Sequence, residues 1–106
     1  MSAKPAIPQQ TERAFMADFR EQAIGFSWLY YHTFNSMYSA PGFPDCTLVK
    51  GGRVLFVELK RVGGKLTADQ ERWLAALREA GAETYLWTPD DWPEIIHVLT
   101  GKEVIG

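Results

Sequence analysis

The sequence has little cysteine and no long apolar run, and each absence removes a class of protein. Its one cysteine, Cys46, has no partner for an internal disulfide, which agrees with a reducing compartment. No window approaches the roughly 18 uninterrupted apolar residues that a membrane-spanning helix needs, so we expect no membrane partner. Residues 1–5 lack the apolar core of a signal peptide, and we therefore expect an intracellular, cytoplasmic protein.

Neither sign of charge is in large excess, because the sequence has 11 Lys and Arg residues and 13 Asp and Glu residues, for a formal net charge of −2. This balance does not by itself indicate a nucleic-acid partner. The distribution is uneven, however, since residues 50–78 carry seven bases and only three acids. A basic patch around an acidic pocket would suit a phosphate substrate held on a metal, and a solvated charged surface would explain the same charges equally well.

The chain is long enough for one domain with a single core, and it shows no internal repeat. Its 46% hydrophobic and 23% charged residues are typical of a folded protein and exclude a largely disordered chain. We expect one domain over residues 11–101, a flexible lead-in over 1–10 and a short tail over 102–106.

The first part of the chain predicts a helix and then a strand. Thr11 can cap a helix that ends near Gly25, because apolar side chains recur between them at helical spacing. Aromatic and β-branched residues over 28–34 predict a strand that includes His32. A single histidine on such an apolar strand face is more often a packed core residue than a metal ligand or a base.

The last part of the chain predicts a helix, a strand and a short helix. Thr67 and Gln70 match a capping box at the start of a helix that runs to about Ala80, with Ala80 facing inward. Residues 83–88 predict a strand, and Pro93 opens the last helix. The whole order, helix, strand, two hairpin strands, helix, strand, helix, predicts an α/β fold in which helices cover both faces of a mixed sheet.

Residues 42–60 form the most informative stretch, because two apolar runs flank Gly51 and Gly52. Such a pair predicts a two-residue hairpin turn, since glycine tolerates the positive φ that the turn requires. In this register Asp45 lies opposite Glu58, with Cβ atoms about 5 Å apart. Lys60 would follow on the same face, roughly 6.6 Å along its strand. Facing like charges are destabilising unless something lies between them, so the spacing suggests a divalent cation.

Both faces of the two hairpin strands are largely apolar, so we expect the hairpin to be central and covered on both sides. Charged side chains near the end of a buried strand are costly to place. An internal ion pair between Lys60 and either Glu58 or Asp45 would be a purely structural explanation. It leaves the second carboxylate unexplained.

Four motifs together resemble a known family. They are Gly-x-Pro-Asp over residues 42–45, Phe-Val-Glu-Leu-Lys-Arg over 56–61, Gly-Gly-Lys-Leu-Thr over 63–67 and Asp-Gln-Glu-Arg-Trp-Leu over 69–74. The combination resembles the virus-type replication-repair nuclease (VRR-Nuc) family of the PD-(D/E)XK nuclease superfamily, over about residues 11–100. The resemblance implies a restriction-endonuclease-like fold and a metal-dependent DNA endonuclease.

The resemblance implies a role for each motif residue. Asp45 and Glu58 match the metal-binding acids, and the backbone carbonyl of Leu59 commonly completes the coordination. Lys60 matches the catalytic lysine that orients or deprotonates the attacking water. Oxygen ligands of this kind favour Mg²⁺ or Mn²⁺.

Two further positions match the family, and each has a structural alternative. Glu12 matches an acid on the first helix that often approaches the metal, although a glutamate in a first turn usually only favours the helix dipole. It matters to the site if that end of the helix abuts Asp45 and Glu58. Gln70 matches a glutamine near the active site, although its capping role would equally explain it.

The resemblance also implies partners and products. Compact stand-alone members of the group are similar to Holliday-junction resolvases, tend to act as homodimers and are commonly encoded by phages or prophages. We therefore expect a homodimer that acts on branched DNA, such as Holliday junctions or flaps. The products would carry a 5′-phosphate and a 3′-hydroxyl. From the basic segment and the loop before Asp45 we expect DNA contacts by Arg61, Lys65, Arg72 and Tyr38.

Two competing hypotheses remain at this stage. The chain could be a non-catalytic DNA-binding or scaffolding module that keeps the nuclease fold, although intact acids and lysine argue against it. Cys46 could be a nucleophile, but it would point away from Asp45 and has no evident base partner.

Overall fold

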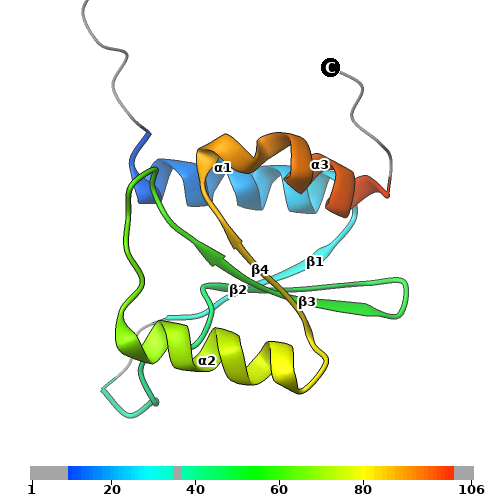
Figure 1. Ribbon diagram of the computed structural model, residues 1–106. Helices are drawn as coiled ribbons and strands as arrows, with labels where there is room; N and C mark the ends of the chain where they lie inside the picture. The colour runs from blue at the N-terminus through cyan, green and yellow to red at the C-terminus, as the bar shows by residue number, and fades with distance from the viewer. Residues whose placement is uncertain (1–9, 35–36, 102–106) are drawn as a thin grey trace, which may run out of the picture.

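In the computed structural model, which describes residues 10–34 and 37–101, helices cover both faces of a mixed sheet, as predicted (Figure 1). The expected tail over 102–106 lies outside the described residues, and so does the expected lead-in apart from Gln10. None of the helices within the described ranges is long and apolar enough to cross a membrane. The elements are α1 (Glu12–Gly25), β1 (Leu29–His32), β2 (Cys46–Lys50), β3 (Arg53–Leu59), α2 (Ala68–Glu79), β4 (Glu83–Trp87), the 3-10 turn η1 (Pro89–Asp91) and α3 (Trp92–Thr100).

The strands lie in the order β1-β2-β3-β4, which follows the chain. The first three strands are antiparallel, while β4 runs parallel to β3. A parallel pair needs a crossover connection, and α2 provides it. In Figure 1, α1 and α3 lie over one face of the sheet and α2 lies across the other.

The hairpin has the predicted turn and register. Gly51 and Gly52 have φ angles of 54° and 81°, the left-handed values that a two-residue hairpin turn needs. The pairing then runs from Lys50 opposite Arg53 to Cys46 opposite Val57, each pair as the sequence predicts.

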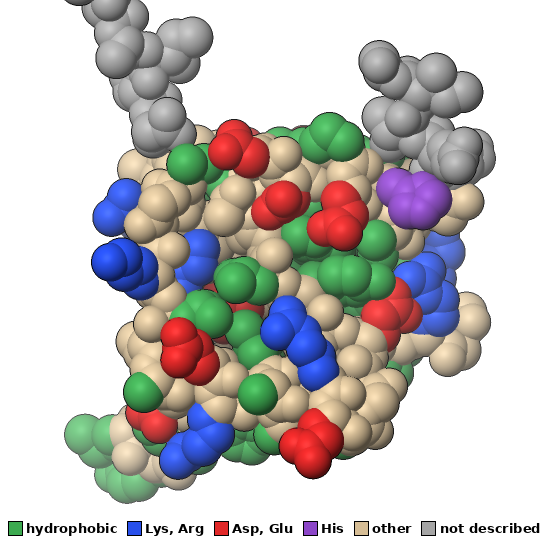
Figure 2. Space-filling model, viewed as in Figure 1, with side chains coloured by type: hydrophobic (Ala, Val, Ile, Leu, Met, Phe, Trp, Pro, Cys, Tyr) green, Lys and Arg blue, Asp and Glu red, His purple; other side chains and the backbone are tan. Residues whose placement is uncertain are grey.

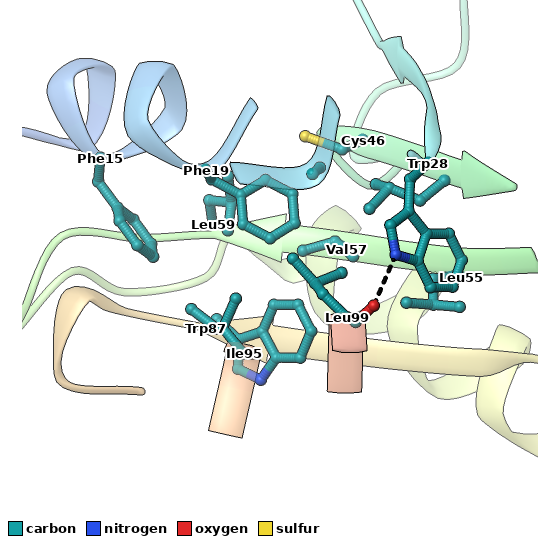
Figure 3. Packing of buried hydrophobic residues seen from close by; sticks show 12 residues of the cluster. Phe15, Phe19, Trp28, Cys46, Leu55, Val57, Leu59, Trp87, Ile95 and Leu99 are labelled. Carbon is teal, nitrogen blue, oxygen red and sulfur yellow. Dashed lines mark hydrogen bonds between the residues drawn. The ribbon is translucent and has the colours of Figure 1, made fainter. Parts of the chain in front are cut away.

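The core lies between the sheet and the α1–α3 layer. Phe15 and Phe19 of α1 are fully buried there, together with Leu55, Val57 and Leu59, which alternate along β3 (Figure 3). The same layer contains the indole of Trp28, whose Nε1 donates a hydrogen bond of 3.0 Å to the carbonyl oxygen of Leu99. This bond ties the start of β1 to the end of α3.

The opposite face of the hairpin is less covered than the sequence predicts. Val49 and Val54 form a cross-strand pair near the turn and are 40% and 43% exposed. The expectation of cover on both sides is therefore wrong at this end, because α2 packs against β4 and its one fully buried residue is Leu74. Ala80 is also exposed rather than inward, since it is the C-cap residue of α2.

Candidate active site

Asp45 and Glu58 meet where the hairpin strands end. Asp45 directly precedes β2, and its Oδ2 accepts a hydrogen bond of 2.9 Å from the backbone N–H of Leu59. That bond places the Asp45 carboxylate beside β3, next to Glu58, as the register requires. Glu58 lies on β3 and is only 1% exposed, although it is a charged residue type that is rarely buried alone.

The surroundings of Glu58 oppose its negative charge. Burial is the main cause that raises the pKa of the Glu58 carboxyl to about 9, and contact with Asp45 raises it further, while Lys60 acts in the opposite direction. Its Oε2 is buried and has no hydrogen-bond partner. A carboxylate in this position is stable only if a cation or a proton neutralises it, so the site favours the binding of positive charge.

A hard divalent cation would neutralise the carboxylates of Asp45 and Glu58. Two facing carboxylates and an unpartnered carboxylate oxygen are the donors that Mg²⁺ and Mn²⁺ prefer. The backbone N–H of Leu59 is engaged with Asp45, and coordination by the Leu59 carbonyl stays a prediction. Within the described ranges no three His, Cys, Asp or Glu side chains lie close enough together to hold a metal ion.

Lys60 and Glu12 form an ion pair at the edge of this site. Lys60 Nζ lies 3.8 Å from Glu12 Oε1, and its side chain is 13% exposed. The start of α1 therefore abuts the end of β3, which is the condition under which Glu12 bears on the site. The structure places Glu12 on Lys60, and a role for Glu12 as a metal ligand stays a prediction.

Gln70 makes the two contacts that the sequence left as alternatives. Its Oε1 accepts the backbone N–H of Thr67 at 2.9 Å, which completes the predicted capping box. Its Nε2 donates to Glu58 Oε1 at 3.3 Å. One amide therefore fixes the start of α2 and contacts the buried acid.

The loop that leads to Asp45 packs closely against α2. Gly42 has a φ of 92°, and a Cβ atom at this position would lie 2.5 Å from the backbone carbon of Asp69. Trp73 Nε1 donates to the carbonyl oxygen of Pro41 at 3.1 Å, and the Phe43 ring packs edge-on against Trp73. This close packing explains the glycine of the Gly-x-Pro-Asp motif and holds Asp45 in place relative to α2.

The residues predicted to contact DNA are all exposed. Lys and Arg side chains line the left edge of Figure 2, beside the β3–α2 connection that carries Arg61 and Lys65. Arg72 pairs with Asp69 at 3.2 Å. Hydrophobic side chains project at the lower left of the same view, from the loop before β2 that includes Tyr38.

The side chains of His32 and Cys46 lie on the face of the sheet away from Glu58. His32 pairs with Cys46 across β1 and β2, and its ring packs edge-on against Phe34. The Cys46 thiol is fully buried, and burial raises its pKa to about 12. Both positions agree with structural roles.

No sequence pattern indicates the cleft that lies beside Gln70. This cleft has a volume of about 840 Å³ and lies between the end of β1, the loop before β2 and the start of α2. The aromatic content of residues 28–34 predicts a strand and does not indicate a cleft.

Comparison with known proteins gives two findings. The VRR-NUC domain family model matches residues 4–88. A solved structure described as a VRR_NUC domain protein shares 16% identity and superposes with a TM-score of 0.57 over 79% of this chain and 82% of that chain. No curated protein is similar enough to the chain to count as a match. The structural likeness confirms the restriction-endonuclease-like fold.

Proposed function

Because the chain belongs to the VRR-NUC domain family, which is a nuclease family, we propose that it is a metal-dependent DNA endonuclease. The observation that supports this most strongly is the pair of facing carboxylates, one of them buried with an unpartnered oxygen. Lys60 and Gln70 border the same pair.

Each side chain has a task in this proposal. Asp45 and Glu58 would hold Mg²⁺ or Mn²⁺, with the backbone of Leu59 fixing the orientation of Asp45. The bound ion would polarise the scissile phosphate and stabilise the negative charge that develops during hydrolysis. Lys60 would hold the attacking water, and its ion pair with Glu12 would keep the ammonium group near the site.

Gln70 would act on Glu58 rather than on the substrate. Its Nε2 holds Glu58 Oε1, which leaves Oε2 as the carboxylate oxygen available to a cation. The exposed Arg61, Lys65 and Arg72 would contact the DNA backbone, a contribution that weakens as salt rises.

Substrate and assembly are further parts of the proposal. We expect selectivity for branched DNA, such as Holliday junctions or flaps. We also expect a homodimer, because one active site cuts one strand and symmetrical incision of a junction needs two matched sites. Phage or prophage origin stays an expectation from the resemblance.

The experiment is a cleavage panel. Duplex, nicked, flapped and four-way-junction DNA are incubated with the protein and Mg²⁺ or Mn²⁺, alongside Asp45→Asn and Lys60→Ala. The proposal expects cleavage of at least one branched substrate by the wild type and its loss in both variants. Equal cleavage by wild type and variants, or cleavage that persists in EDTA, would contradict it.

A non-catalytic DNA-binding or scaffolding module is the second candidate. The observation that favours it is the lack, within the described ranges, of three potential metal ligands close together. Titration calorimetry separates the two candidates. A module would show no heat of Mn²⁺ binding and would bind DNA equally well with and without EDTA.

A further inference from the structure

The cleft beside Gln70 has the size and composition of a ligand site. Its volume of about 840 Å³ falls within the roughly 300–1,000 Å³ that is usual for such sites. One side is aromatic and apolar, and the other side is the polar first turn of α2. The lining residues that matter below are Tyr31, Thr33, Phe34, Thr67, Asp69, Gln70 and Trp73.

Two aromatic side chains of this cleft are exposed to water. Tyr31, on the edge strand β1, is 64% exposed, and Phe34, just beyond that strand, is 77% exposed. Together with Met37 and Phe43, which also line the cleft, they form an apolar surface in a concave place rather than scattered single residues. Apolar and aromatic side chains gathered in a concave place are a common feature of small-molecule binding sites.

The cleft adjoins the proposed active site through two lining residues that contact Glu58 and Asp45, although neither acid itself lines the cleft. Gln70 lines the cleft and contacts Glu58 through its Nε2. Thr33 lines it too, and its backbone N–H donates a hydrogen bond of 2.8 Å to the carbonyl oxygen of Asp45. A nucleotide next to a phosphate held at these acids would therefore lie at the cleft.

One wall of the cleft is formed in advance. Trp73 is bonded to the Pro41 carbonyl, and Phe43 packs edge-on against both Trp73 and Phe56. These contacts fix the loop relative to α2 and β3. A ligand then loses little free energy to ordering this wall.

The chemistry of the walls suits a nucleobase. Aromatic side chains stack on the faces of bases with little regard for sequence. The acid of the cleft, Asp69, is paired with Arg72 at 3.2 Å, which reduces its repulsion of DNA.

From this placement we propose that the cleft binds an unpaired nucleobase next to the scissile phosphate. In a duplex the faces of the bases are already stacked on each other, so only unpaired or splayed nucleotides can enter at low cost. The cleft then makes unpaired DNA a better substrate than perfect duplex. This inference rests on the proposed function for the position of the phosphate, but the binding of the base needs no catalysis.

The test measures binding of the base in EDTA, where no cleavage occurs. The probe is a flap DNA that carries the fluorescent base 2-aminopurine in its unpaired arm, next to the junction. Wild-type protein should change the fluorescence of the probe and should bind it more tightly than duplex of the same length. Tyr31→Ala and Phe34→Ala should each weaken binding to the flap by about 5- to 150-fold, the loss typical of one stacking contact, with little change for duplex.

Leu29→Ala is the matched control. Leu29 lies on the same strand and the same sheet face as Tyr31, is 72% exposed and does not line the cleft. It should bind the flap as the wild type does, and Tyr31→Phe should retain binding. Circular dichroism of each variant confirms the fold.

Three results would overturn the inference: wild-type binding that does not distinguish flap from duplex, Tyr31→Ala and Phe34→Ala binding like Leu29→Ala, or an unchanged fluorescence signal. A further contradicting result is that Tyr31→Ala and Phe34→Ala convert an oligomer of the protein into monomers while the change in 2-aminopurine fluorescence persists. The apolar surface would then be an interface with a second copy of the chain. Failure of the proposed function looks different, because the base would still bind in EDTA while no DNA is cleaved with Mg²⁺ or Mn²⁺.

Discussion

The side-chain amide of Gln70 joins the capped end of α2 to the buried acid of the sheet. Its Nε2 lies 3.3 Å from Glu58 Oε1 while its Oε1 accepts the backbone N–H of Thr67. A residue that only capped the helix would not need the amide nitrogen, since glutamate serves in a capping box as well. The contact with Glu58 is therefore the part that distinguishes glutamine here.

Gln70→Glu separates the two contacts of this side chain. The carboxylate can still accept the Thr67 N–H, but it places a third negative charge against Glu58 and Asp45. We expect cleavage to fall by at least tenfold. Thr67→Ala is the cap-only control, which should cost about 0.5–2 kcal/mol of stability and leave most of the cleavage rate. Equal rates for Gln70→Glu and the wild type would show that the contact with Glu58 is incidental.

Glu58→Gln should stabilise the metal-free protein. Glu58 is 1% exposed, has an unpartnered Oε2 and faces Asp45, and its pKa of about 9 means that folding at pH 7 requires the carboxyl to take up a proton, a cost that a neutral isostere avoids. We expect the free energy of unfolding in EDTA to rise by about 1–3 kcal/mol, measured by urea denaturation. Added Mn²⁺ should stabilise the wild type and not the variant. A less stable variant in EDTA would mean that the Glu58 carboxylate is satisfied without a cation.

The Arg53–Glu83 ion pair, at the other end of the sheet, should make the stability of the protein depend on pH. Hydrogen bonds from Arg53 chiefly lower the pKa of the Glu83 carboxyl, and the Tyr85 hydroxyl donates to it as well. Because the folded-state pKa lies below the unfolded value, the pair stabilises the protein above that value and loses its effect as pH falls through the folded-state pKa. At pH 7 the free energy of unfolding of the wild type should exceed that of Glu83→Gln by about 1 kcal/mol or less, because the ion pair is partly exposed to water.

The measurement for this pair is urea denaturation between pH 7 and pH 3. The difference between wild type and Glu83→Gln should shrink toward zero in acid. Glu79→Gln, at an exposed position of α2, provides the comparison for loss of one acid without the ion pair. A difference that is constant with pH would show that Glu83 stabilises the fold by packing alone.

Gly42→Ala should disturb the connection that leads to Asp45. Besides the strained φ of 92°, a Cβ atom would lie 2.5 Å from the backbone of Asp69. Gly63→Ala is the matched control, because Gly63 has a φ of 79° and no atom within 4 Å of the added Cβ. The control should lose about 1–2 kcal/mol through backbone strain, and Gly42→Ala should lose clearly more, together with cleavage activity. Thermal unfolding curves and cleavage rates of the two variants check this.

Local rules in the sequence account for much of the fold. The positive φ of Gly51 and Gly52 sets the hairpin register, and with it the meeting of Asp45 and Glu58. The capping box of Thr67 and Gln70 sets the start of α2. Each depends on residues a few positions apart, where one backbone geometry is clearly preferred.

Features that depend on how far one element covers another were not predictable. Val49 and Val54 alternate like buried residues, yet α2 leaves them exposed. The aromatic content of residues 28–34 predicts a strand but not the exposure of Tyr31 and Phe34, which the structure places on a cleft. The second bond of Gln70 also required the tertiary structure, because it joins α2 to a strand 12 residues away.

The most direct test of the account is the cleavage rate of Glu58→Gln against Glu21→Gln under single-turnover conditions with Mg²⁺. Glu21 is an exposed acid of α1, so its variant matches the loss of one carboxylate outside the site. The account predicts wild-type rates for Glu21→Gln and loss of cleavage by at least a hundredfold for a well-folded Glu58→Gln. Equal rates for the two variants would contradict a metal-dependent active site at Asp45 and Glu58.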